Sequence, residues 1–237
     1  MALSKNQLDK VGDRLRRPEA PRDADLAIYD EYRDSHYGPL AEVATQVEEI
    51  TGIEPSSRLK HLESVIEKLR RQPGRLSRIA DIAGCRIRVA SLLEQQAALD
   101  QIQAAFPGAR VRDYRTASQF GYRAVHVITT LEDGKSVEIQ VRTMPQNMWA
   151  NLSESVARGF DIRLKYGGGP ESILVALGEL SEHAAELDDL ILQARESRLS
   201  AERDADGLDR LVAASFESFH RESVTLLVGA HHDSLPD

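Results

Sequence analysis

The feature that most constrains the fold is a β-hairpin in the middle of the chain, "VHVITTLEDGKSVEIQVRT", residues 125–143. Both flanking segments alternate apolar and polar residues with the period of two that is typical of strands. The loop "EDG" suits a type I turn followed by Gly134 in the left-handed conformation, which pairs Leu131 with Lys135. A one-residue slip from this register would mix the two faces. One face is therefore predicted to carry four polar residues: His126, Glu138, Gln140 and Arg142.

That polar face has two interpretations. Antiparallel strands commonly bury one side and expose the other to water, so it can be an ordinary solvated surface. It can also line a binding site, and the sequence outside the hairpin has to decide between the two.

The segments around the hairpin predict an α+β fold. "IAGCRIRVAS" and "ARVRDYR" are expected to be strands, and "SLLEQQAALDQIQAAF" between them is expected to be a helix. Upstream, we expect helices from Asp23 to about Gly52, broken at "YGP", and a helix over "EPSSRLKHLESVIEKLRRQPG" with Ser56 or Ser57 as its N-cap. Downstream, residues 173–219 have helical spacing, with a second helix near residues 208–219. The expected architecture is a central mixed sheet flanked by helices, with a C-terminal helical extension.

The chain is expected to divide into three parts. Residues 1–22 form a frayed arm or a short helix with a linker, residues 23–170 form the main domain, and residues 171–237 form the helical extension and tail. The single cysteine, Cys85, excludes an internal disulfide and lies in an apolar run. No segment has the length or character of a signal peptide or a membrane span, so we expect a cytoplasmic protein without a membrane partner.

Charge is distributed unevenly. The net charge is −8, which does not favour adhesion of the whole molecule to nucleic acid. The segment from Arg58 to Arg88, however, contains nine Lys or Arg residues and only three Asp or Glu. On a helical wheel, Lys60 and Lys68 lie on one side with Ser64 between them. This arrangement is either a solvated face or a two-lysine clamp for a triphosphate.

Four segments together carry a resemblance to a known family. "RLKHLESVIEKL", "DIAGCRI", "DYRTASQFGYRAVH" and "VEIQVRT" resemble, in order and spacing, the signature blocks of the RelA/SpoT-type alarmone synthetase domain. The resemblance spans about Tyr29 to Leu192. With no hydrolase region before it and no long regulatory region after it, the chain is similar to the small, single-domain synthetases. The resemblance implies a nucleotidyltransferase-like fold and transfer of pyrophosphate from ATP to the 3′-hydroxyl of GDP or GTP, which makes (p)ppGpp.

The resemblance also implies roles for individual residues. On the ATP side, the phosphates are expected at the two lysines and the adenine between two guanidinium groups, which gives the set Arg58, Lys60, Ser64, Lys68 and Arg86. Asp81 and Glu138 are the expected catalytic carboxylates and the expected ligands of Mg²⁺, and Glu138 is the candidate general base. On the acceptor side, Tyr122 is expected to stack on the base. The other expected acceptor residues are Arg123, His126, Gln140 and Arg142. For Tyr122 a core aromatic, for His126 a satisfied strand histidine, and for Gln140 and Arg142 a structural network remain alternatives.

The loop "DYRTASQFGY" departs from the family pattern. Family members commonly carry a Pro-Lys pair and an Asn there; this loop has none of the three and is one residue shorter. The missing lysine removes a cation from the acceptor side, and Arg115 or Arg123 are candidate replacements.

Three functions therefore stay open. The chain is a synthetase acting on GDP or GTP, a toxin-type relative acting on adenosine nucleotides or the 3′ end of tRNA, or a nucleotide-binding regulator without turnover. Retention of Asp81 and Glu138 argues against the regulator. The C-terminal extension can join copies into a homo-oligomer, cover its own domain, or receive an antitoxin protein.

Overall fold

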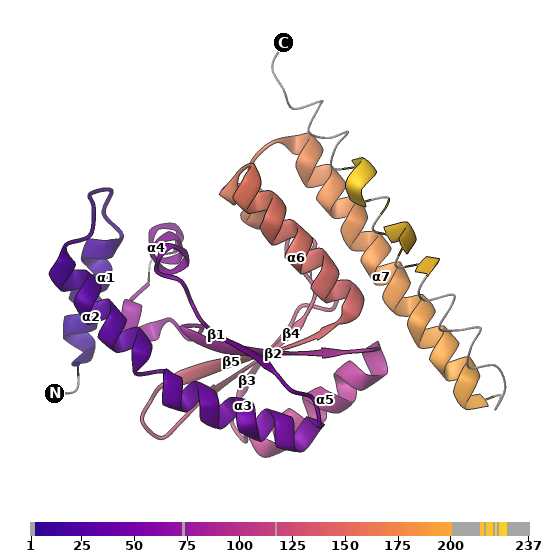
Figure 1. The fold of residues 1–237 in the computed structure, drawn as a ribbon, viewed down its shortest axis with the longest axis horizontal. Coiled ribbons are helices and arrows are strands. Elements are labelled where there is room, and N and C mark those ends of the chain that lie inside the picture. Colours follow the sequence, from indigo (N-terminus) through magenta and orange to yellow (C-terminus); the bar gives the residue numbers. More distant parts are fainter. Residues whose placement is uncertain are drawn as a thin grey trace, which may run out of the picture. The chain divides into compact units, whose positions relative to one another are not determined.

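The computed structural model describes residues 3–72, 74–116 and 118–200, together with residues 214–215, 217–219, 221 and 223–226 of the tail. The described residues have the predicted α+β fold (Figure 1). They belong to two compact units, which we describe separately. The first unit is drawn from Met1–Ile87, Leu99–Arg112 and His126–Gln140, and the second from Arg88–Ala98, Asp113–Val125 and Val141–Asp237.

Five strands form one sheet in the order β1-β2-β5-β4-β3 (Figure 1). Their bounds are β1 Ser56–Leu59, β2 Ala83–Val89, β3 Arg110–Asp113, β4 Val125–Thr130 and β5 Ser136–Thr143. β1 runs antiparallel to β2, with Arg58 opposite Gly84. On the other side of β2, Gly84 lies against Glu138 and Arg86 bonds to Gln140 of β5. Because the offset between these partners is constant, β2 and β5 run parallel, and the sheet is mixed as predicted.

The central hairpin has the predicted loop. Gly134 has a φ of 79° and donates to the carbonyl of Leu131 at 2.9 Å, while the Leu131 amide donates to Lys135 at 2.9 Å. The predicted pairing of Leu131 with Lys135 is confirmed. Both faces of β5 are buried, since Glu138 and Arg142 are only 8% and 3% exposed. The interpretation of the polar face as a solvated outer surface is therefore wrong.

The helix predicted from Ser56 or Ser57 is a second correction. The structure has the edge strand β1 there, and helix α4 begins only at Leu62 and ends at Arg71, with His61 as its N-cap. The pairing with β2 continues one residue past β1, because the Lys60 amide donates to Ile82 at 2.8 Å. These inter-strand hydrogen bonds replace the ones that a longer helix would have supplied. The helical-wheel argument that placed Lys60 and Lys68 on one helix is accordingly wrong.

Helices around the first unit build its core. They are α1 (Lys5–Leu15), α2 (Asp23–Asp34), α3 (Tyr37–Thr51), α4, the 3₁₀ helix η1 (Leu76–Arg78) and the second half of α5 (Leu92–Ala105). One fully buried cluster consists of Val11, Leu15, Tyr29, Val65, Leu69, Leu76 and Ile82. Of the two alternatives for residues 1–22, the structure has the short helix, capped by a reciprocal pair of hydrogen bonds between Ser4 and Gln7. The break before α3 falls at Ser35 and His36, just before the predicted "YGP", because proline is tolerated in the first turn of a helix.

The second unit is mainly helical. It contains α6 (Met144–Gly159), the 3₁₀ helix η2 (Ile162–Tyr166) and α7 (Glu171–Ser200). The apolar stripe predicted from the spacing of this segment is buried at five of its six positions, Leu177, Leu180, Ala184, Leu187 and Ile191, and partly exposed at the sixth, Ala194. The Trp149 indole of α6 donates to Leu177 at 2.9 Å. Much of the second helix predicted near residues 208–219 lies outside the described residues.

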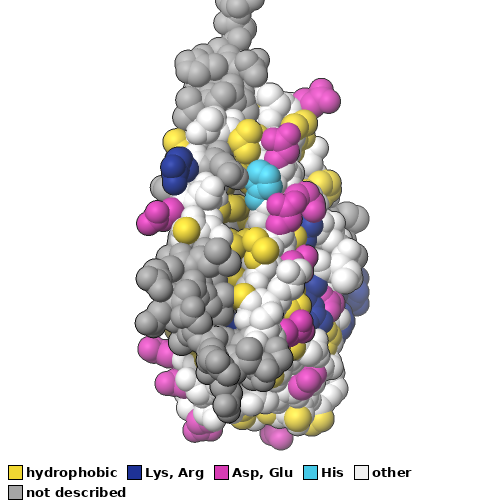
Figure 2. All heavy atoms as spheres, turned by 90° about the vertical axis from the view of Figure 1, so that its right-hand side faces the viewer, with side chains coloured by type: hydrophobic (Ala, Val, Ile, Leu, Met, Phe, Trp, Pro, Cys, Tyr) yellow, Lys and Arg dark blue, Asp and Glu magenta, His cyan; other side chains and the backbone are white. Residues whose placement is uncertain are grey.

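On the side of the molecule that carries α7, acidic and hydrophobic side chains are interspersed on the surface (Figure 2). Val175 and Leu190 are exposed hydrophobic residues of this helix. No helix among the described residues combines the length and the apolar character that a membrane crossing requires.

Candidate active site

Two lysines and an aspartate form a charged cluster in the first unit. Lys60 and Lys68 donate to the two oxygens of Asp81 at 2.8 and 2.7 Å. Burial raises the pKa of Asp81, but the two ammonium groups outweigh this effect and lower the pKa to about 2. Asp81 is therefore ionised at neutral pH. The lysines reach it from different elements, Lys60 from the end of β1 and Lys68 from α4, where Ser64 lies one turn earlier on the same face.

Glu138 is the second carboxylate of this unit. Its side chain accepts from Gln140 at 2.8 Å, and its other oxygen lies 3.4 Å from Nδ1 of His126. Burial raises the pKa of Glu138, yet the interactions with His126 and Gln140 outweigh burial and hold the pKa below its usual value. The negative charge of Asp81 acts in the opposite direction. The buried Glu138 is thus an anion at neutral pH, held in one orientation by the strand residues beside it.

Arg58 and Arg86 lie on the same face of the sheet around a glycine. Arg58 is opposite Gly84, and Arg86 is two residues further along β2, where its Nε donates to Gln140 at 3.3 Å. A Cβ on Gly84 would come within 3.2 Å of the Glu138 carbonyl. Glycine therefore keeps the sheet surface flat between the two arginines and Glu138. A planar ring can be received there between guanidinium groups.

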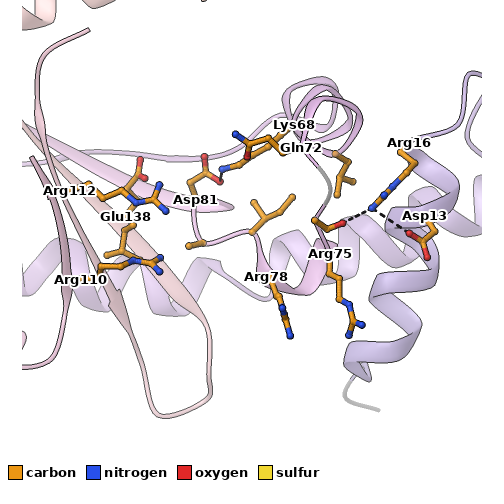
Figure 3. Close-up of a pocket in the computed structure, with 15 residues that line it drawn as sticks. Asp13, Arg16, Lys68, Gln72, Arg75, Arg78, Asp81, Arg110, Arg112 and Glu138 are labelled. Carbon is orange, nitrogen blue, oxygen red and sulfur yellow. Dashed lines mark hydrogen bonds and ion pairs between the residues drawn. The ribbon is translucent and has the colours of Figure 1, made fainter. Parts of the chain in front are cut away.

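A cavity of about 600 Å³ adjoins the two carboxylates (Figure 3). Asp81, Glu138 and Lys68 line it. Five arginines line it as well, none of which the sequence analysis singled out: Arg16, Arg75, Arg78, Arg110 and Arg112. In Figure 3, Arg110 and Arg112 lie beside Glu138, and Lys68 lies beside Asp81. The cavity is thus rich in cations, which suits a polyanionic ligand.

The two arginines of β3 had a signal in the sequence. In "RVRD", Arg110 and Arg112 are two residues apart, so they share one face of a strand. No ion pair with another described residue neutralises either guanidinium. Both charges are available to an anion in the cavity.

The carboxylates fit a magnesium ion. Mg²⁺ prefers oxygen ligands and is usually bound by one or two carboxylates together with substrate phosphates. Asp81 and Glu138 are both ionised and line the same cavity. Among the described residues there is no cluster of three or more metal-ligating side chains, so phosphates would have to complete the coordination.

The second unit contains the predicted base-stacking residue. The Tyr122 hydroxyl accepts from Arg142 at 2.8 Å, and the Arg142 guanidinium lies 5.1 Å from the centre of the Tyr122 ring. Tyr114 contacts Tyr122 edge-on, with ring centres 5.7 Å apart. These contacts place Arg142, which was predicted to be an acceptor residue or part of a structural network, against Tyr122. The tyrosine is half-buried, so part of its ring remains available.

Both candidate replacements for the missing lysine have acidic partners. Arg123 donates to Glu182 and to the Ser181 carbonyl of α7, each at 2.9 Å. Arg115 donates to Asp113 at 2.9 Å. Among the described residues, Arg78, Arg110 and Arg112 of the first-unit cavity are cations without such acidic partners.

Comparison with known proteins assigns the family. Residues 57–166 match the model of the region found in RelA/SpoT proteins. The GTP pyrophosphokinase YjbM of Bacillus subtilis is 31% identical over 179 residues, which cover 70% of this chain and 76% of that protein. An uncharacterised protein of Mycobacterium tuberculosis is 35% identical over 178 residues, and the match covers 72% of this chain. It covers only 64% of the mycobacterial protein, so the chain spans less than two thirds of that relative.

The fold has solved counterparts. Small alarmone synthetase 1 of B. subtilis, in a crystal structure bound to its product pppGpp, superposes with a TM-score of 0.62 at 24% identity. The match covers 72% of this chain and 98% of that one. The sequence match to YjbM, at 31% identity over 70% of this chain and 76% of that protein, establishes that the chain belongs to the RelA/SpoT family, whose model it also matches.

Proposed function

We propose that the chain transfers a pyrophosphate group from ATP to the 3′-hydroxyl of GDP or GTP, with Mg²⁺ as cofactor. The observation that carries this proposal is the pair of ionised carboxylates, Asp81 and Glu138, that lines one cation-rich cavity with Lys68. The names of the relatives agree with it, since YjbM is a GTP pyrophosphokinase and the solved synthetase binds pppGpp.

The lysine cluster suits the ATP side. Without a nucleotide, Lys60 and Lys68 are neutralised by Asp81. An ATP triphosphate offers the two ammonium groups more negative charge than one carboxylate does, so the lysines turn to the phosphates. Asp81, freed from the lysines, would hold Mg²⁺ together with Glu138, and the ion would supply charge neutralisation at the phosphates. Arg58 and Arg86 hold the adenine on the flat surface over Gly84.

Glu138 suits the chemical step. The 3′-oxygen of the acceptor attacks the β-phosphorus of ATP, a new O–P bond forms, and the bond between the β-phosphorus and the α–β bridging oxygen breaks, so that AMP leaves. The proton of the hydroxyl passes to Glu138, which must be ionised to accept it. Gln140 and His126 keep its oxygens oriented. A low pKa makes Glu138 a weak base, so positioning is expected to contribute more than basicity.

Tyr122 suits the acceptor side. Its ring is steadied by Arg142 at the hydroxyl and by Tyr114 at the edge. The base of the acceptor stacks on the exposed part of the ring.

A transfer assay tests the proposal. The protein is incubated with Mg²⁺ and ATP labelled in the β-phosphate, and GDP, GTP, ADP, ATP and deacylated tRNA are offered in parallel. We expect label on the guanosine nucleotides; label on ADP, ATP or tRNA alone would replace the acceptor with that of a toxin-type relative. No transfer to any acceptor would favour the regulator.

A variant pair tests the general base. Glu138→Gln keeps the size of the side chain but cannot take a proton, so turnover should fall at least a hundredfold. ATP binding, measured by calorimetry, should remain. Glu132→Gln, at an exposed position of the hairpin loop, removes the same charge and should leave turnover unchanged. Full activity of Glu138→Gln would exclude the role of Glu138.

A further inference from the structure

A strained turn precedes Tyr122. The Tyr122 amide donates to the carbonyl of Gln119 at 3.0 Å, and the two residues form an antiparallel bridge. Between them, Phe120 has a φ of 51° and Gly121 a φ of 83°. Positive φ values at both central positions define a type I′ turn, whose first central position favours Asn, Asp or Gly. Phe120 is the one non-glycine residue with positive φ in the described part of the chain.

The Phe120 side chain also lies in solvent. It is 60% exposed, the largest exposed fraction among the large hydrophobic residues that the structure describes. One edge of its ring rests on Gly167, where a Cβ would collide with the ring. This contact leaves most of the ring uncovered. Neither burial nor backbone preference therefore explains a phenylalanine at this position.

The turn is held rigidly by the helices of its own unit. The Ser181 hydroxyl donates to the Gly121 carbonyl at 2.6 Å. A Cβ on Gly121 would come within 2.7 Å of the Trp149 ring and 2.9 Å of Ser181. Gly121 thus packs directly against α6 and α7, and these helices fix the turn that carries the Phe120 ring. A fixed aromatic ring loses little conformational entropy when a flat ligand stacks on it.

The surroundings favour a nucleotide over an apolar protein surface. Tyr122, the base-stacking residue of the proposed function, is two residues away. Gly167, which contacts the Phe120 ring, follows the 3₁₀ helix η2, and η2 contains Lys165. No ion pair with a described residue neutralises this lysine. Aromatic rings next to cations are the recognition chemistry of unpaired bases and their phosphates.

We propose that Phe120 is a stacking platform for an unpaired nucleobase of the acceptor and so determines acceptor specificity. This inference rests on the proposed function. The base has two possible sources: the base of a free acceptor nucleotide, or a base next to the 3′ end of a single strand. The departure of the loop from its family pattern is then a change in what the acceptor side recognises.

The turn favours asparagine at position 120, whereas a stacked base requires an aromatic ring there, and the test uses this difference. Phe120→Asn places the preferred residue at the turn, so the Tm should rise by about 2–4 °C. Loss of the ring should weaken binding of the acceptor about tenfold or more. Phe120→Tyr keeps the ring and should bind like the wild type. Phe160→Asn removes another exposed phenylalanine, but one with negative φ, and should change neither Tm nor binding.

Binding is measured at equilibrium, without turnover. GDP, GTP and a short fluorescent single-stranded RNA are titrated separately, and ATP is titrated as the donor control. A loss confined to the mononucleotides identifies the first source, and a loss confined to the RNA identifies the second. Unchanged binding of all three acceptors by Phe120→Asn would overturn the inference, as would a lower Tm, because a lower Tm assigns the ring to packing on Gly167.

The same variants separate this inference from the proposed function. If the wild type transfers no pyrophosphate but its acceptor binding still depends on Phe120, the proposed reaction fails and the platform stands. If transfer to GDP proceeds and Phe120→Asn leaves the acceptor KM and RNA binding unchanged, the reaction stands and the platform fails.

Discussion

The buried carboxyl of Asp188, on α7, gives the sharpest prediction about stability. Asp188 is 3% exposed and accepts from the hydroxyl of Thr143, the N-cap of α6, at 2.9 Å. Its other oxygen has no hydrogen-bond partner among the described residues. Burial raises the pKa of Asp188 from an ordinary 3.8 to about 7, and Asp189 adds to the increase; the polar groups of Thr143 and Gln146 and the charge of Arg123 offset only part of it.

The sign and size of the effect follow from proton linkage. The folded state holds the proton more tightly than the unfolded state, so stability is greatest below pH 3.8 and declines until the pH passes about 7. One pKa unit corresponds to about 1.4 kcal/mol, and the group is half-protonated at pH 7, so the decline from this group alone is about 1.6 kcal/mol between pH 5.5 and pH 7 and about 2 kcal/mol between pH 5.5 and pH 8.5. Above about pH 8.5 the contribution is constant. That is a large share of a typical stability of about 5–15 kcal/mol.

Asp188→Asn tests this reasoning. The amide retains an acceptor for Thr143 and cannot ionise. Urea unfolding at pH 5.5, 7 and 8.5 should show that the variant gains about 2 kcal/mol relative to wild type as the pH rises. Glu186→Gln, at an exposed position of the same helix, removes the same charge and should keep the pH dependence of the wild type. Parallel curves for wild type and Asp188→Asn would refute a carboxyl that titrates near neutrality.

Three further changes test the site and its supports. Lys68→Ala removes one of the two cations on Asp81 and should raise the KM for ATP about tenfold or more while the acceptor KM stays constant; equal losses for both substrates would point to misfolding. Tyr122→Ala should raise the acceptor KM about tenfold with an unchanged KM for ATP, and Tyr122→Phe, which loses only the hydrogen bond from Arg142, should be milder. Gly121→Ala should lower the free energy of unfolding by about 1–3 kcal/mol, because its φ of 83° is strained for alanine and Trp149 occupies the space; a wild-type urea midpoint would contradict the tight turn.

The hairpin was predictable from sequence because its information is local. A glycine at the required position and two alternating strands specify both the loop and the register, and the structure agrees at Leu131 and Lys135. The segment from Ser56 to Arg71 was misread for the opposite reason. Its strand is stabilised by pairing with β2, which lies more than twenty residues further along the chain, and no local pattern reports that partner.

The candidate site was partly predictable. The family blocks lead to Lys60, Asp81 and Glu138, and the structure gathers these residues in one unit. Arg78 on η1 also lines the cavity, but a single arginine in a three-residue 3₁₀ helix carries no such signal in the sequence. Asp188 was missed because its burial depends on α7 covering it, and that is a property of the packed unit, not of the sequence around it.

The first helix bears on how the protein can be shortened. Val11 and Leu15 of α1 belong to the buried cluster that also contains Leu69 and Leu76, and Arg16 just beyond the helix lines the cavity. Removing the first 22 residues would expose a hydrophobic patch near Asp81 and remove part of the cavity wall. The truncated protein is expected both to aggregate during purification and to lose activity. Such a loss would not show whether those residues bind nucleotides.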